Sequence, residues 1–378
     1  MEWSDGTRHA LGLEPTPELY IAHLVQCFRA VKRVLRDDGT LWCNIGDSQA
    51  ANRGYQVKDS KWTDVGNEAG MTVPTGLKPK DCIGIPWMLA FALRADGWYW
   101  RDTIVWAKGA SFCAGWSGSV MPESVRDRPT KAWETVLLFS KSRKYAYDWF
   151  GAREAGKVWT GAAGSFARDS KEADVPGQAR RQHRADRPDG YSGNGTRNWR
   201  NVWAIPTRGT KFSHYAAYPI DLPAKCITAG TLPMVCGECG CPWERVVRKG
   251  EPDTAHRAAC GADASGGYSG KSRPGAQEAR AQNPSETKAR ILAGMRKDEV
   301  AGWRTTCGHP CRKPGRAVVL DPFGGTGTTA QAAEMLGRDS ILIDLGSEYC
   351  DMAKERMATP WKTSPGGRKK ESKLKPLF

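Results

Sequence analysis

A glycine-rich turn near the end of the chain constrains the fold more than any other feature of the sequence. The strand-like run RAVVL leads into the turn DPFGGTGTTA at residues 321–330, and the helix-like run TTAQAAEMLG overlaps it and leads out. Gly325 and Gly327 allow a tight turn and a close approach to a ligand, and the helix start presents free N–H groups. The pattern predicts a strand–turn–helix corner of an α/β fold that binds a nucleotide-like cofactor.

Two acids strengthen this prediction. Asp321 ends the strand before the turn, where its carboxylate can accept a hydrogen bond from a ligand amine. Asp344 ends the following strand-like run SILID, where an acid can hold the two ribose hydroxyls of an adenosine. NAD is compatible with the G-x-G-x-x-A spacing that ends at Ala330, but Asp-Pro-Phe before the glycines is not a dinucleotide signature. The alternative interpretation is an ordinary strand–helix corner without a ligand.

Strand-like and helix-like patterns alternate in the first part of the chain. Apolar residues recur at helical spacing in residues 17–36 and 83–100, while 41–48, 101–108 and 135–142 are short apolar runs typical of strands. Alternation of this kind predicts an α/β sheet.

The charge balance indicates a polyanionic partner. The 378 residues carry a formal net charge of +15, for which nucleic acid is the simplest partner and a solvated basic surface is the alternative. The pattern of strands and helices breaks at residues 143–212, and from Arg143 to Lys211 there are 14 Lys and Arg against 7 Asp and Glu, with Gly, Ser, Asn and Trp interleaved. We interpret this segment as a module that contacts nucleic acid, because aromatic residues among arginines suit base stacking and phosphate contact. A disordered basic linker is the alternative.

The sequence shows no export or membrane signal. The N-terminus lacks a basic region followed by an apolar stretch, and no apolar run approaches the roughly 18 residues that span a bilayer. We therefore expect a cytoplasmic protein. Its 12 cysteines should then serve as metal ligands or core residues rather than as disulfides.

Two close cysteine pairs lie on either side of a long insert. Cys236 and Cys239 belong to CGEC, and Cys307 and Cys311 belong to CGHPC. This spacing predicts a four-thiolate structural zinc ribbon, with Cys241 and His309 as substitute ligands. Reduced thiols without a metal are the alternative.

Several blocks of the sequence resemble one enzyme family. The run VVLDPFGGTGTTAQAAEMLGRDSILIDLGSEYCDMAKERM resembles the S-adenosylmethionine (SAM) motif of the DNA amino-methyltransferases, which methylate adenine N6 or cytosine N4. The upstream blocks GLEPTPELYIAHLVQCFRAVKRVLRDDGTLWCNIGDS, LKPKDCIGIPWMLAFALRADGWYWRDTIVWAK, MPESVRDRPTKAWETVLLFSKS and HYAAYPIDLPAKCITAGT resemble further blocks of the family in content and order.

The order of the blocks resembles the β type of this family, in which the fold is circularly rearranged. The resemblance implies a Rossmann-like methyltransferase sheet with an inserted basic target-recognition region, and a late glycine turn is expected in it. The cysteine pairs add a probable zinc-ribbon insert to this sheet. The implied parts are a catalytic half at 1–142, a target-recognition region at 143–212, a SAM-binding half at 213–235 and 312–360, a Cys-rich insert at 236–311 and a basic tail at 361–378.

The resemblance also implies roles for individual residues. Asp344 would hold the ribose of SAM, and double-stranded DNA would be the partner. Asp81 and Ile83 lie in a block that flanks the target pocket, although Asp81 also suits the N-cap of its helix. The residues expected to line the methionine end of SAM are Asp321, Phe323, Gly324, Gly325 and Gly327.

One element of the family is not found in the sequence. The catalytic loop has Asp or Ser, then Pro-Pro, then an aromatic residue that stacks on the flipped base, but this chain contains no Pro-Pro dipeptide. The loop would fall at or before Met1, so the sequence reading assigns no catalytic residue and interprets the chain as starting at an internal methionine or coming from a decayed gene. The hypothesis is then a DNA amino-methyltransferase whose chain as given does not methylate efficiently. A DNA-binding protein without catalysis and a nicotinamide oxidoreductase are the alternatives.

Overall fold

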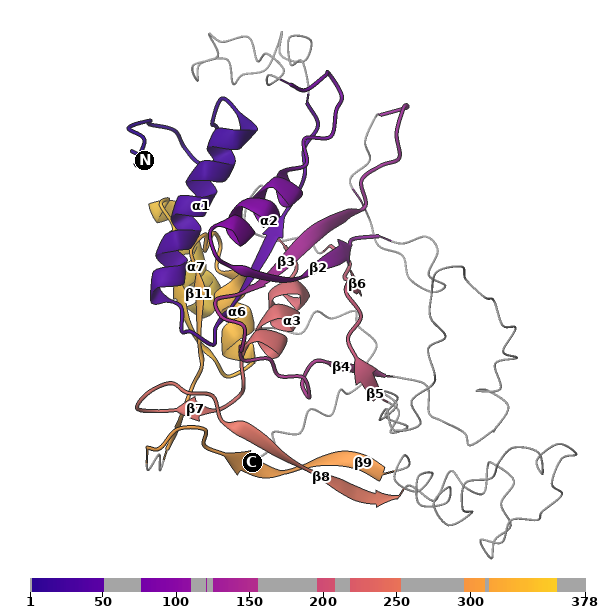
Figure 1. The fold of residues 1–378 in the computed structure, drawn as a ribbon, viewed down its shortest axis with the longest axis vertical. Coiled ribbons are helices and arrows are strands. Elements are labelled where there is room, and N and C mark those ends of the chain that lie inside the picture. Colours follow the sequence, from indigo (N-terminus) through magenta and orange to yellow (C-terminus); the bar gives the residue numbers. More distant parts are fainter. Residues whose placement is uncertain are drawn as a thin grey trace, which may run out of the picture.

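The chain forms a mixed α/β fold, as the alternation of patterns predicts (Figure 1). None of the helices in the described part of the chain combines the length and apolar character that crossing a bilayer requires. The structure is a computed structural model, and it describes residues 2–50, 76–109, 120, 125–155, 196–207, 218–252, 296–309 and 313–358.

The larger sheet contains four strands, which in spatial order are β1 (Thr40–Ile45), β3 (Trp133–Ser140), β2 (Tyr99–Ala107) and β6 (Val202–Ala204). β3 pairs antiparallel with both β1 and β2, and β6 pairs parallel with β2. Because β3 is covered on both faces, it contains the uninterrupted apolar run VLLF and is buried from Thr135 to Ser140.

Two helices, α1 (Pro17–Val34) and α2 (Ile85–Ala95), pack with this sheet around the main core. The hydroxyl of Thr16 accepts a hydrogen bond from the Leu19 N–H at 3.2 Å and so caps the start of α1. The apolar face predicted for residues 17–36 is confirmed, and the helix ends two residues earlier than predicted.

The run 83–100, predicted as a helix closed by Gly97, begins as a helix two residues later, at Ile85, and ends at Ala95. Closure at Gly97 is confirmed, because Gly97 has a φ of +87°, and the residues after it start β2. The predicted N-cap, Asp81, accepts from the Lys78 N–H instead. The carboxylate of Asp47 accepts from the first N–H groups of the helix, at 2.9 and 3.0 Å.

The late elements form a second, parallel pair of strands, β11 (Val318–Asp321) and β12 (Asp339–Leu342), with helices α6 (Thr328–Met335) and α7 (Ser347–Ala358). Helix α3 (Asp221–Gly230) packs on α6. Leu320 of β11 packs against the same core as α1 and α2, and Figure 1 shows these yellow elements beside the indigo α1. The beginning and the end of the chain therefore share one core.

The described parts of the segment 143–212 contain three short strands. β4 (Arg153–Ala155) and β5 (Thr196–Asn198) pair antiparallel, and β6 joins the larger sheet. The sequence predicts that the tryptophans of this segment stack on bases, but Trp203 is buried in the core and the Trp199 indole N–H donates to the Arg153 carbonyl at 2.8 Å. These two side chains stabilise the fold.

The Cys-rich segment contains two short paired strands, β7 (Val235–Cys236) and β10 (Pro314–Gly315), and a long antiparallel ribbon, β8 (Glu244–Pro252) with β9 (Arg296–Arg304). The ribbon runs along the lower edge of the molecule in Figure 1, away from the helices.

Candidate functional site

The glycine turn joins the carboxyl end of β11 to the start of α6. Gly325 and Gly327 have φ values of +48° and +80°, in the left-handed region that other residues rarely adopt. Gly327 is the N-cap of α6, and no side chain caps the helix there. The first turn of α6 therefore has N–H groups that no side chain caps.

Two of the glycines are also required by packing. A Cβ atom on Gly324 would lie 2.9 Å from the Cβ of Leu342, and one on Gly327 would lie 2.9 Å from the Cβ of Ala353. Both distances are too short for real contacts, so the turn is pressed against β12 and α7. A side chain at either position would displace the turn.

Asp344 lies directly beside the turn. Its two carboxylate oxygens accept hydrogen bonds from the Gly325 N–H at 2.8 Å and the Gly346 N–H at 2.9 Å. Each oxygen keeps a further acceptor site, because a carboxylate has about four lone-pair sites. The structure therefore brings the predicted acid and the predicted turn together.

Asp321 belongs to a hydroxyl network that the sequence reading did not find. Its Oδ2 accepts from the Thr329 hydroxyl at 2.5 Å and from the Tyr218 hydroxyl at 3.3 Å, and its Oδ1 accepts from the Phe323 N–H at 3.0 Å. Burial, followed by the nearby charge of Asp321, raises the pKa of Tyr218 well above its ordinary value, so this hydroxyl stays protonated. Thr329 lies two residues after Gly327, and this closeness in sequence was the available signal. Tyr218 reaches the site only through the tertiary fold.

These residues face one cavity of about 1070 Å³. The Phe323 ring is 47% exposed and meets Phe28 of α1 edge-on, with ring centroids 6.3 Å apart. Gly327 supports the turn from behind, against α7. The predicted cofactor residues that line the cavity are Asp321, Phe323, Gly324, Gly325 and Asp344.

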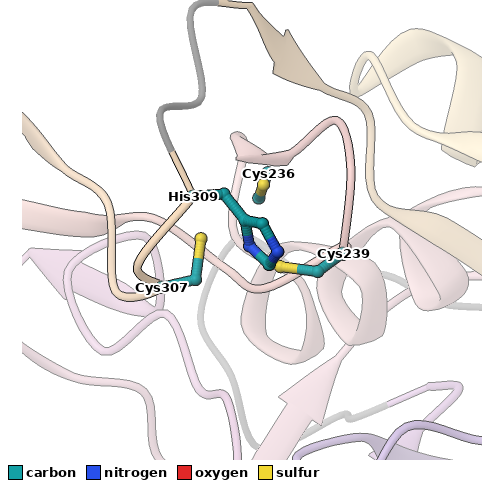
Figure 2. Close-up of side chains that lie close together, drawn as sticks. All are labelled: Cys236, Cys239, Cys307 and His309. Atoms are coloured by element: carbon teal, nitrogen blue, oxygen red, sulfur yellow. The ribbon is translucent and has the colours of Figure 1, made fainter.

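The Cys-rich segment brings three thiols and an imidazole together. The ligand atoms of Cys236, Cys239, Cys307 and His309 all lie within 4.8 Å of one another, and Figure 2 shows the four side chains turned toward a common centre. Cys236 is buried and His309 is exposed. The remaining predicted ligand, Cys311, lies outside the described residues.

The backbone around the first cysteine pair is a tight turn. The Cys236 N–H donates to the Cys241 carbonyl at 2.7 Å, and the Gly240 N–H donates to the Cys236 carbonyl at 2.8 Å. The guanidinium of Arg36, after the end of α1, donates to the Cys239 carbonyl at 2.6 Å. The cluster is therefore anchored to the main body of the protein.

Comparisons with known proteins point to one family. The profile of the DNA methylase family matches residues 7–237 and 309–355, which omits the β8–β9 ribbon. The Type II methyltransferase M.XycI of Xanthomonas campestris pv. cyanopsidis is 39% identical over 229 residues, which are 60% of this chain and 62% of the relative. The Type II methyltransferase M.SmaI of Serratia marcescens is 31% identical over 353 residues, which are 93% of this chain and 78% of the relative.

The share of the relative's length that is matched differs from one relative to another. The chain spans 62% of the length of M.XycI and likewise 62% of M.Cfr9I of Citrobacter freundii. Among solved structures, the PvuII DNA methyltransferase (cytosine-N4-specific) is similar with a TM-score of 0.45 at 12% identity, covering 94% of this chain and 79% of the other.

Proposed function

Because the chain belongs to the DNA methylase family, we propose that it binds SAM and methylates an exocyclic amino group of DNA, either adenine N6 or cytosine N4. One observation carries the proposal: Asp321, the glycine turn and Asp344 line a single cavity next to an uncapped helix start. Asp344 would accept hydrogen bonds from the ribose hydroxyls, while Asp321 and Phe323 would contact the methionine end. SAM supplies an electrophilic methyl group, and the protein contributes orientation and charge complementarity.

The charges at the corner favour SAM over a dinucleotide. Asp321 and Asp344 flank the turn, and SAM carries an ammonium and a sulfonium, which are attracted by carboxylates. The pyrophosphate of NAD would place negative charge at the same turn, close to Asp321. The turn packs against β12 and α7 on one side and lines the cavity on the other, so a ligand can approach it from the cavity.

Calorimetry with SAM and with NAD tests this part of the proposal. We expect binding of SAM and not of NAD. Asp344→Asn should weaken SAM binding about 10- to 100-fold, because hydrogen bonds to a charged acceptor contribute about 1.5–3 kcal/mol. Asp351→Asn is the matched control, since Asp351 is an exposed acid on α7 that pairs with Lys354. Equal SAM affinity in the two variants would contradict the assigned role of Asp344.

The two halves of the chain suggest a circularly rearranged methyltransferase sheet. Strands β1, β2 and β3 come first, residues 143–212 with β6 follow, and the glycine turn comes last. We propose that the segment 143–212 contacts double-stranded DNA, supported by its charge and by the net charge of +15. Fluorescence anisotropy with duplex DNA should show affinity that falls steeply with salt, because phosphate contacts release counterions.

Methyl transfer separates the enzyme from a DNA-binding protein that lacks catalysis. Duplex DNA is incubated with methyl-labelled SAM, and the nucleosides are then analysed by mass spectrometry. Labelled adenine or cytosine would establish the activity and identify the base. DNA binding and SAM binding without transfer would favour the inactive alternative.

We further propose a structural zinc ion held by Cys236, Cys239 and Cys307, with His309 or Cys311 as the fourth ligand. The donor set supports this, because three thiolates and one imidazole or thiolate suit tetrahedral zinc. The observed grouping of Cys236, Cys239, Cys307 and His309 gives one complete set.

Elemental analysis of protein purified without chelators tests the metal site. We expect about one zinc per chain, and loss of zinc in Cys307→Ser. His309→Ala and Cys311→Ser then identify the fourth ligand, because the variant that removes a true ligand releases zinc faster to a chelator. Wild-type protein without bound zinc would rule the site out.

A further inference from the structure

The β8–β9 ribbon is attached to the beginning of the basic segment 143–212 by two ion pairs. The Asp148 carboxylate accepts two hydrogen bonds from the Arg245 guanidinium of β8, at 3.1 and 2.6 Å. The Arg153 guanidinium of β4 pairs with the Asp298 carboxylate of β9 at 3.3 Å. All four side chains are largely buried, and charged side chains are rarely buried without a partner. Residues 97 and 145 positions apart in the sequence are therefore held together.

Aromatic rings restrict the two guanidinium groups at this junction. The Arg245 guanidinium lies 5.3 Å from the centroid of the Phe150 ring and 4.4 Å from that of Trp303. The Arg153 guanidinium lies 5.3 Å from the Phe150 centroid and 4.6 Å from that of Trp149. Planar guanidinium groups pack on ring faces, so the junction restricts the orientation of the ribbon as well as its distance from β4.

The junction continues into the β4–β5 pair, which Figure 1 shows between β6 and the ribbon. The Trp199 indole N–H donates to the Arg153 carbonyl at 2.8 Å. The next residue, Glu154, accepts at Oε1 from the guanidinium groups of Arg197 at 2.9 Å and Arg200 at 2.8 Å. The positions of these two arginines therefore depend on β4, which the ribbon holds through Arg153.

Arg197 and Arg200 have the properties of phosphate contacts. Both side chains are exposed, and both pair with the single carboxylate of Glu154, which leaves a surplus of positive charge. A guanidinium has five N–H donors in a planar fork, so each arginine can also donate to phosphate oxygens. The phosphates of DNA are the regularly spaced anions that such side chains contact.

We propose that the β8–β9 ribbon is a positioning element for DNA binding. It holds Arg153 in β4, and β4 directs Arg197 and Arg200 toward the phosphates of duplex DNA. The inference rests on the proposed function, because it takes DNA as the partner of the segment 143–212. It goes further by assigning a role to the ribbon, which the family profile does not match.

Asp298→Asn tests the proposal, with fluorescence anisotropy of duplex DNA over a range of salt concentrations. Loss of a negative charge by itself strengthens binding to DNA. We expect the opposite, a Kd about 5-fold higher, which is the low end of coupling between separate sites. The plot of log K against log salt should become less steep by about one to two, because each lost phosphate contact lowers its slope by about one. Partial unfolding would lower the active fraction and leave this slope unchanged.

Glu299→Gln is the matched control. It removes the same charge from the adjacent residue of β9, where Glu299 forms an exposed pair with Arg248, and it should bind DNA at least as tightly as the wild type. Arg245→Lys loosens the other ion pair at constant net charge, since lysine lacks the planar fork. It should weaken DNA binding as Asp298→Asn does, so the test does not depend on one variant.

A double-mutant cycle shows whether the ribbon acts through the two arginines. Arg197→Gln with Arg200→Gln should reduce the salt slope, and adding Asp298→Asn should then cause little further loss, because changes that act through one contact are not additive. Fully additive losses, or equal affinities of Asp298→Asn and Glu299→Gln, would overturn this inference alone. Wild-type protein that does not bind duplex DNA would refute the DNA contact of residues 143–212 and this inference with it.

Discussion

The four-stranded sheet and the β11–β12 pair contain similar residues in different surroundings. Leu137 and Phe139 of β3 are completely buried, whereas Val318 of β11 and Ile341 of β12 are more than half exposed. Residue type therefore does not explain the difference, which comes from the neighbouring strands. Among the strands that the structure describes, β3 has a partner on each side, and β11 has one. We infer that the four-stranded sheet contributes most of the stability, while the β11–β12 corner offers binding surface.

The largest expected effect lies in the four-stranded sheet. Phe139→Ala should reduce the free energy of unfolding by about 4 kcal/mol, because it removes a fully buried ring and leaves a cavity. Ile341→Ala, at a side chain that is 54% exposed, should cost less than about 1 kcal/mol. Urea denaturation measures both losses, and equal losses would show that the four-stranded sheet does not contribute more stability than the β11–β12 corner.

The β8–β9 ribbon offers a third region in which a buried and an exposed contact can be compared. The Asp148 carboxylate accepts two hydrogen bonds from the Arg245 guanidinium, at 3.1 and 2.6 Å, and both side chains are largely buried. Asp148→Ala should cost about 3 kcal/mol, because it leaves a buried charge without its partner. Glu244→Ala breaks an exposed pair with Arg304 and should cost about 0.5 kcal/mol. Denaturation of both variants checks the difference.

A pair of glycine variants tests how tightly the corner is packed. Gly327 and Gly337 both have positive φ values, but a Cβ would meet Ala353 at the first and nothing within 4 Å at the second. Gly337→Ala should cost about 1 kcal/mol for the backbone alone. Gly327→Ala should cost about 2 kcal/mol because the contact with α7 is added, and it should weaken SAM binding. Equal losses of stability in the two variants would show that the corner relaxes to accommodate the added Cβ atom.

The smallest expected effect concerns the start of α2. Asp47→Ala removes the carboxylate that accepts from the first N–H groups of the helix, and should cost about 1 kcal/mol. Asp81→Ala, at the residue that the sequence suggested as the cap, should cost less than half as much. The reverse order in thermal denaturation would restore the sequence-based prediction.

Local patterns predicted much of this fold. The apolar spacing of residues 17–36 and the short runs before Ile45 and Ser140 predicted a helix and two strands that the structure contains, because each pattern reflects which face is buried. Asp344 was placed near the glycine turn because strand, turn and helix lengths set that position. The assigned contacts of Asp344 with ribose stay a prediction.

The features that the sequence did not predict depend on tertiary contacts. Asp47 caps a helix that begins nearly forty residues later, and Tyr218 approaches Asp321 from a distant segment. Trp203 looked like a stacking residue among arginines, but a parallel pairing with β2 buries it. No local pattern contains such information, since each case depends on elements far apart in the chain.

The β8–β9 ribbon leaves the body beside Cys241 and returns to it beside Cys307, so its two ends meet at the cysteine cluster. Because the two ends of the ribbon are held close together, lengthening or shortening its outer loop changes the entropy of loop closure only slightly. Lineages could therefore lengthen, shorten or exchange this arm without disturbing the sheet register or the glycine corner, which makes it a natural place for relatives to diverge.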